Sequence, residues 1–102
     1  MPALQVVKPE QPNIDANYLA WYFCENCGMK RLQWMQREIE HWIDAGFEPD
    51  MIQEAIDRTS RAPRPSWAYL NAIMNNAAAA YAYTLSRFLT MRKTNTNNRN
   101  YY

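Results

Sequence analysis

The chain has 102 residues, the length of one ordinary domain, and its 48% hydrophobic and 14% aromatic residues suffice for a core without disulfide bonds. No apolar stretch approaches the roughly 20 residues that cross a bilayer, and the N-terminus lacks the basic start and apolar run of a signal peptide. We therefore expect a cytoplasmic protein that does not contact the membrane.

The net charge of +1 conceals a strong difference between the two halves of the chain. Residues 1–57 carry four basic and ten acidic side chains, a net charge of −6, whereas residues 58–102 carry seven basic side chains and no acidic one. A basic half without carboxylates is typical of a surface that binds polyanions. A solubilising basic end without a partner is the alternative.

The two ends of the chain differ from its middle in composition. Residues 1–12 contain three prolines and few large apolar side chains, so we expect a flexible leader. Residues 93–102 are polar, rich in asparagine and free of acids, and we expect a disordered basic tail there. The folded domain is accordingly predicted over residues 13–92.

The first helix is predicted to begin after Asp15, whose carboxylate can accept the unpaired N–H groups of a first turn. Apolar side chains then follow at the spacing of one helical stripe: Tyr18, Leu19, Tyr22 and Phe23. Gly28 is a suitable end for this helix, because glycine tolerates the left-handed conformation that terminates helices.

A second helix is predicted over residues 31–45, where apolar side chains recur at steps of three and four: Leu32, Met35, Ile39, Trp42 and Ile43. Gly46 follows where a C-terminal cap belongs. Pro49 then begins a third helix, since its missing N–H would be unpaired in a first turn anyway. This helix is expected to end near Thr59 or Ser60.

The segment Arg61–Pro65 is predicted to be a short basic connector, because each of its prolines disfavours a helical conformation in the residue before it. Ser66 can cap a fourth helix, and its apolar spacing continues as far as Phe88. Two outcomes are open here. The helix either runs on without interruption, or breaks near Asn75–Asn76 and resumes near Thr84.

A Trp-x-x-x-Gly helix end, a new helix, a basic connector and an aromatic-rich last helix follow one another in His41–Ile52, Ala55–Ile56 and Pro65–Ile73. This order resembles the DnaD-like domain of Gram-positive and phage replication proteins, and Tyr22, Glu25, Asn26 and Gly28 are similar to its first-helix ending. The resemblance implies a compact helical domain from a bacterium or its phage. It also implies a primosomal accessory role in DNA remodelling or helicase delivery.

Residues in the basic half are the candidates for DNA contact, because aromatic rings stack on unpaired bases and arginines neutralise phosphates. The last helix of the family that the chain resembles carries a Tyr-x-x-x-Ile-x-x-x-Trp signature for DNA binding. It is matched by Tyr69 and Ile73, but Ala77 replaces the tryptophan, and the spacing predicts that all three lie on one helical face. We expect Tyr69 and Ile73 to be core residues and leave Trp67 undecided. The candidate DNA-binding residues are Arg58, Arg61, Arg64, Trp67, Tyr69, Ile73, Arg87, Arg92, Lys93 and Arg99.

No catalytic or metal site is predicted. Cys24 and Cys27 have the spacing of a zinc or redox pair, but only His41 could add a ligand to them, whereas zinc needs about four. Two free cysteines near a helix end are the simpler interpretation, and His41 is expected to be a surface residue. The sequence contains no phosphate-binding glycine motif, so we expect no cofactor.

The sequence therefore predicts an all-α bundle of four or five short helices with the core Ile39, Trp42, Ile52, Ile56, Tyr69, Leu70 and Ile73. The leading hypothesis for function is a non-enzymatic replication module that binds single- or double-stranded DNA, with low specificity, through its basic half. The alternative is a protein-interaction module that docks a replicative helicase or initiator protein without touching DNA. The sequence leaves open whether the chain forms homo-oligomers.

Overall fold

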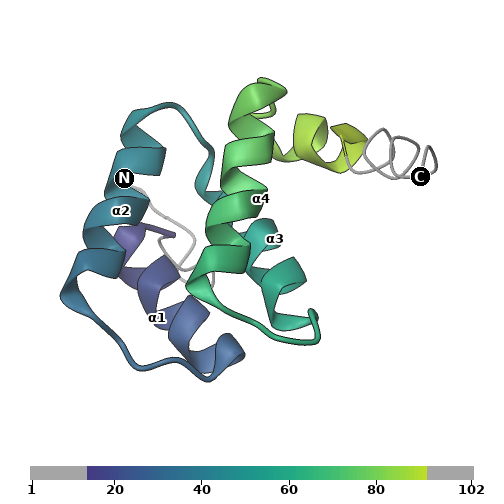
Figure 1. Cartoon of the computed structure of the whole chain (residues 1–102). Coiled ribbons are helices and arrows are strands. Elements are labelled where there is room, and N and C mark those ends of the chain that lie inside the picture. Colours follow the sequence, from purple (N-terminus) through teal and green to yellow (C-terminus); the bar gives the residue numbers. More distant parts are fainter. Residues whose placement is uncertain (1–13, 92–102) are drawn as a thin grey trace, which may run out of the picture.

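The computed structural model describes residues 14–91, which form helices joined by short loops (Figure 1). The helices are α1 (Ala16–Cys27), α2 (Gln33–Asp44), α3 (Pro49–Ser60) and α4 (Trp67–Ala79), followed by a fifth short helix over residues 85–91. Within these residues there is no strand, so the predicted all-α class is confirmed. The leader predicted over residues 1–12 and the tail predicted over 93–102 lie outside the described residues.

Both predicted ends of α1 are confirmed. The backbone N–H of Tyr18 donates a hydrogen bond of 2.9 Å to Asp15 Oδ1, which makes Asp15 the N-cap. At the other end Gly28 has a φ of 68°, and its N–H bonds to the carbonyl of Cys24. A residue with a Cβ atom would be strained in this left-handed conformation, which explains why glycine ends the helix.

The helix α2 begins two residues later than predicted, at Gln33, because Leu32 is still extended and its side chain makes no capping hydrogen bond. The helix ends at Asp44, and Gly46 follows with a φ of 113°. Pro49 occupies the first position of α3, as predicted from its missing N–H.

The continuous last helix that the apolar spacing allowed is not formed. The helix α4 ends at Ala79, and Tyr81 adopts a φ of 58° that reverses the chain. The second alternative placed the break near Asn75–Asn76, which is too early, but it correctly expected a new helix near Thr84. The N–H groups of Ala80, Tyr81 and Ala82 all bond back to α4, and these bonds stabilise the reversal.

The core lies between the inner faces of the helices. Of the predicted core residues, Ile39, Ile52, Ile56 and Leu70 are fully buried. Trp42 and Ile73 are only half-buried at its edge, and the prediction that Tyr69 is a core residue is wrong, since its side chain is 44% exposed. Consecutive residues of a helix lie about 100° apart around its axis. Tyr69 is therefore turned away from the buried stripe that Leu70, Met74 and Ala77 form.

Three hydrogen bonds described here connect elements that are distant in the sequence. The Tyr22 hydroxyl donates a hydrogen bond of 2.6 Å to Asp57 Oδ1, joining α1 to α3, and this bond raises the pKa of Tyr22 above its usual value. The Glu48 carboxylate accepts a hydrogen bond of 3.0 Å from the backbone N–H of Leu85. The backbone N–H of Glu48 donates a second hydrogen bond to the carbonyl of Tyr83. The 85–91 helix is therefore tied to the start of α3.

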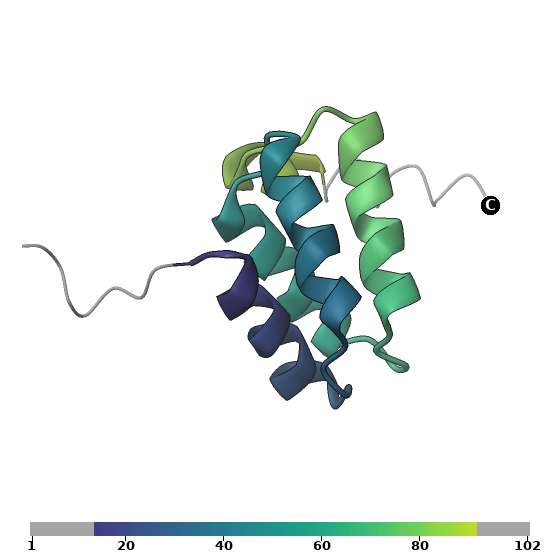
Figure 2. The same ribbon diagram turned by 90° about the vertical axis from the view of Figure 1, so that its left-hand side faces the viewer.

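The loop 28–32, between α1 and α2, and the connector 61–66, between α3 and α4, lie at the same end of the bundle in both views (Figure 1, Figure 2). The 85–91 helix lies near the opposite end (Figure 1). This arrangement divides the candidate basic residues between two places. Among residues 14–91, no helix has the length and apolar character needed to span a membrane.

Candidate nucleic-acid interface

The bundle end that carries both loops gathers basic and aromatic side chains, and we call it the two-loop end. It comprises Lys30 and Arg31 from the first loop, Trp34 from the first turn of α2, and Arg61 and Arg64 from the connector, all of them exposed, together with one exposed carboxylate, Glu25, from the last turn of α1. The helices α2 and α4 both begin here, and neither has an acidic residue in its first turn. The helices α1 and α3 end here, however, so the negative ends of their dipoles offset the positive ends of α2 and α4, and the positive charge of this end comes from its basic side chains.

Trp67, which the sequence left undecided, is packed into a cluster of aromatic rings at this end. Its ring stacks on Trp42, with centroids 5.4 Å apart and planes 9° apart. Phe23 and Trp34 meet it edge-on at 5.3 and 4.9 Å. The ring of Trp67 therefore packs against three other rings of the protein. Within this cluster Trp34 is the exposed member, at 40%.

Two of the candidate arginines are drawn toward one carboxylate. Arg58 Nε lies 3.2 Å from Glu54 Oε2, and the Arg58 guanidinium carbon lies 4.0 Å from the centroid of the Phe88 ring. Arg61 is 3.9 Å from the same Glu54 oxygen, but 63% of its side chain is exposed. Arg58 is thus a structural residue of α3, whereas Arg61 can still turn toward a phosphate.

Arg64 and Arg87 are exposed, but the structure does not bring them together. Arg64 belongs to the connector at the two-loop end, while Arg87 belongs to the 85–91 helix near the other end of the bundle (Figure 1). The candidates Arg92, Lys93 and Arg99 lie outside the described residues.

The three signature positions of α4 do not share one exposed face. Tyr69 is 44% exposed, Ile73 is half-buried and Ala77 is fully buried. A step of four residues advances about 400° around a helix, so each position lies about 40° further round than the one before. The signature therefore passes from the surface into the core, and the tryptophan that the sequence lacks would point inward.

Lys30, Arg31 and Trp34 are further candidates that were not predicted from the sequence, because all three belong to the half of the chain with negative net charge. Arg31 donates hydrogen bonds of 2.8 Å to Asn17 Oδ1 and 2.7 Å to Gln36 Oε1. Both acceptors are neutral, but both also line the acidic groove between α1 and α2, so they hold the guanidinium group of Arg31 toward that groove. A lysine–arginine pair directly before an uncapped helix start was the signal available in the sequence.

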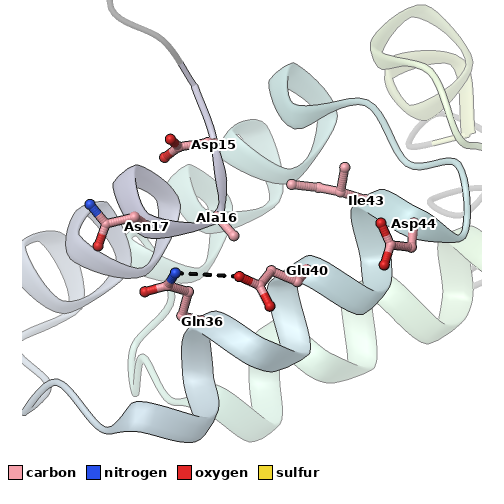
Figure 3. A pocket seen from close by; sticks show the side chains of 7 residues that line it. All are labelled: Asp15, Ala16, Asn17, Gln36, Glu40, Ile43 and Asp44. Atoms are coloured by element: carbon pink, nitrogen blue, oxygen red, sulfur yellow. Dashed lines mark hydrogen bonds between the residues drawn. The ribbon is translucent and has the colours of Figure 1, made fainter.

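A separate groove between α1 and α2 has the opposite charge (Figure 3). Its volume is about 230 Å³, and three carboxylates line it together with an amide that bonds to one of them, Gln36 Nε2 to Glu40 Oε2 at 3.4 Å. The carboxylates are those of Asp15, Glu40 and Asp44. They repel a polyanion, so this groove is not included in the candidate interface.

Cys24 and Cys27 are both free thiols on the last turns of α1. Burial raises the pKa of each above its usual value, and the Cys24 sulfur donates a weak hydrogen bond to Met35 Sδ at 3.8 Å. Across residues 14–91, no three His, Cys, Asp or Glu side chains are grouped so that they could hold a metal ion. His41 is exposed on α2, as expected.

The raised thiol pKa values predict slow alkylation of the folded protein. Thiolate is the reactive form, so the iodoacetamide rate near neutral pH should be lower than in the urea-unfolded chain, and its rise with pH should begin at higher pH. The same shift stabilises the fold fully below the unfolded thiol pKa, and this contribution disappears as pH rises through the folded pKa. Mass spectrometry at successive pH values measures the rates. Equal pH profiles in the two states would contradict the prediction.

The described residues define a small all-α module with a basic, aromatic end. A family model for replication initiation and membrane attachment matches residues 32–87, which is more than half of the chain. The chain belongs to this family, which confirms the predicted DnaD-like resemblance and assigns the chain to replication initiation. No curated protein and no solved structure matches the chain significantly.

Proposed function

We propose that this chain is a non-enzymatic accessory module of replication initiation that binds DNA through the basic residues of its C-terminal half. The observation that carries the proposal is the exposure of Arg61, Arg64 and Arg87 on a half of the chain that contains no carboxylate side chain. Such arginines bind phosphates, so binding is of low sequence specificity and falls steeply with salt.

The test is fluorescence anisotropy with a labelled DNA oligonucleotide at about 50 and 200 mM salt, the range over which phosphate-driven binding weakens strongly. The triple variant Arg61→Ala/Arg64→Ala/Arg87→Ala should bind more weakly, and its salt slope should fall by about one for each phosphate that the protein no longer neutralises. Arg37→Ala is the matched control, since Arg37 is an exposed arginine of the acidic half.

Deletion of residues 92–102 is the companion variant, because it removes Arg92, Lys93 and Arg99 without touching the described fold. A deletion from Thr84 onward is unsuitable, since it removes the fully buried Phe88. DNA affinity that neither the triple arginine variant nor this truncation alters would refute the proposal.

A module that docks a replicative helicase or initiator protein is the second candidate, and one surface favours it. The helix α1 carries Tyr18, Trp21 and Tyr22, whose ring centroids lie 5.7 to 6.5 Å apart, and Trp21 is 49% exposed. Exposed, clustered aromatic rings are typical of protein interfaces. Together with the acidic groove between α1 and α2, they suit a partner with a basic segment. Trp21→Ala would weaken such a complex and leave DNA affinity unchanged.

A further inference from the structure

We infer that Trp34, together with the loop 28–32, forms a stacking site for an unpaired base of single-stranded DNA. The inference rests on the proposed DNA-binding function. It adds a DNA-contacting site within residues 1–57, although the negative net charge of this half argues against DNA contact there. Three observations carry it: a half-exposed tryptophan that is held rigidly, exposed basic residues in both loops at the same end of the bundle, Lys30 and Arg64, and a first turn of α2 without acidic residues.

The Trp34 side chain is 40% exposed, yet its position is fixed from behind. Its ring stands perpendicular to that of Trp67, at an angle of 89° and a centroid distance of 4.9 Å, and Trp67 is itself stacked on Trp42. A ring held in this way loses little conformational freedom when a base stacks on it. An aromatic side chain that is both fixed and open is suited to receive a planar ligand.

Basic groups belong to both loops at this end. Lys30 belongs to the loop 28–32 that precedes Trp34, and Arg64 belongs to the connector that leads to Trp67, whereas the guanidinium group of Arg31 is held away by Asn17 and Gln36. Leu32, which is 40% exposed, precedes α2 without a side-chain capping bond, so the first backbone N–H groups of the helix also point to this end. A strand whose base lies on Trp34 would therefore place its phosphates among positive groups.

The carboxylate that follows on the same face of α2 is Glu38, one turn beyond Trp34. It repels phosphates, so the strand would run across the two-loop end and not along α2. The other exposed tryptophan, Trp21, has Glu25 one turn away and no basic residue in its own helix. Of the two exposed tryptophans among residues 14–91, only Trp34 combines stacking area with positive charge.

The chemistry favours a single strand over a duplex. In a duplex every base is stacked on its neighbours, and proteins reach only its edges in the grooves. An unpaired base offers a free face, and its stacking on an aromatic side chain strengthens binding by roughly 5- to 150-fold. Removal of the Trp34 ring should therefore weaken binding to single strands selectively.

The experiment compares Trp34→Leu with Trp21→Leu in the full chain, using an oligo(dT) strand and a duplex of equal length as probes. Leucine keeps apolar contact with Trp67 but offers no ring, and circular dichroism verifies that both variants fold. Trp34→Leu should weaken oligo(dT) binding by about fivefold or more and change duplex binding much less. Trp21→Leu should change neither, and Trp34→Phe should restore most of the single-strand affinity.

A second measurement does not depend on the leucine variants being tolerated. Stacking on a base quenches tryptophan fluorescence, so oligo(dT) should quench the native protein, and the quenching should be absent from Trp34→Phe. Equal decreases of affinity in the Trp34 and Trp21 variants, or quenching that persists in Trp34→Phe, would overturn the stacking site while leaving the proposed DNA-binding function intact. Failure of the native chain to bind either probe would overturn both.

Discussion

Replacing Phe88 with alanine should lower the free energy of unfolding by about 3–5 kcal/mol. The Phe88 ring is fully buried, and the guanidinium group of Arg58 lies over it at 4.0 Å, so the substitution removes both apolar packing and a cation–π interaction. The total stability of a domain is only about 5–15 kcal/mol. The expected decrease is therefore a large part of what holds the fold together.

Urea unfolding followed by circular dichroism measures this effect. Leu89→Ala is the matched control, because Leu89 is the next residue of the same helix and is 42% exposed. It should change the stability by only about 0.5 kcal/mol. If Phe88→Ala were no more damaging than Leu89→Ala, the 85–91 helix would not belong to the cooperative unit that α1 to α4 form.

Introducing the tryptophan of the family's signature, by Ala77→Trp, should destabilise the fold by about 3 kcal/mol or more and should not strengthen DNA binding. Ala77 is fully buried in the core, where an indole ring has no room. Adding even a few methylene groups to a packed interior costs about 1–3 kcal/mol, and an indole adds far more volume. The physical reason is the drift of about 40° in a four-residue step, which turns this position inward.

Ala79→Trp provides the control for this prediction, since Ala79 is the exposed last residue of α4. The same substitution there should leave the urea midpoint nearly unchanged. A stable Ala77→Trp variant with tighter DNA binding would show that the third signature position faces the ligand.

Much of this fold was predictable because its signals are local. A helix start depends on a side chain that reaches N–H groups two or three residues away, as Asp15 and Ser66 do. A helix end depends on the conformation of one residue, as at Gly28. These interactions act within one turn, so the sequence determines them almost independently of the rest of the chain.

The errors occurred where local spacing was ambiguous. The apolar period continues from Ala77 to Tyr81 and Leu85 without a break, and no glycine or proline marks the reversal there. The turn is stabilised because Glu48, at the start of α3, bonds to the backbone of Tyr83 and Leu85 from outside the segment. Tyr69 was misplaced for a related reason, since its burial depends on how α4 is rotated against its neighbours.

In the candidate interface, too, some features were predictable from the sequence and others depend on how the helices pack. From sequence alone, the separation of charge between residues 1–57 and 58–102 predicted a basic surface that includes Arg61, Arg64 and Arg87, and all three are exposed. The folded chain turns Arg58 to Glu54 and Phe88, and it brings the loop 28–32 to the same end as the connector. Charge counted along the chain cannot reveal this, because a surface is a property of neighbours in space.

The sequence by itself determined the helical class, most of the helix ends, much of the predicted core and the family. The tertiary structure decided where the last helix breaks, which tryptophans are exposed and which loops share an end. Capping and hydrophobic periodicity involve residues a few positions apart. The two-loop end exists because α1 packs against both α2 and α3, and α3 packs against α4, with the ring of Trp67 meeting those of Trp34 and Trp42 across the bundle.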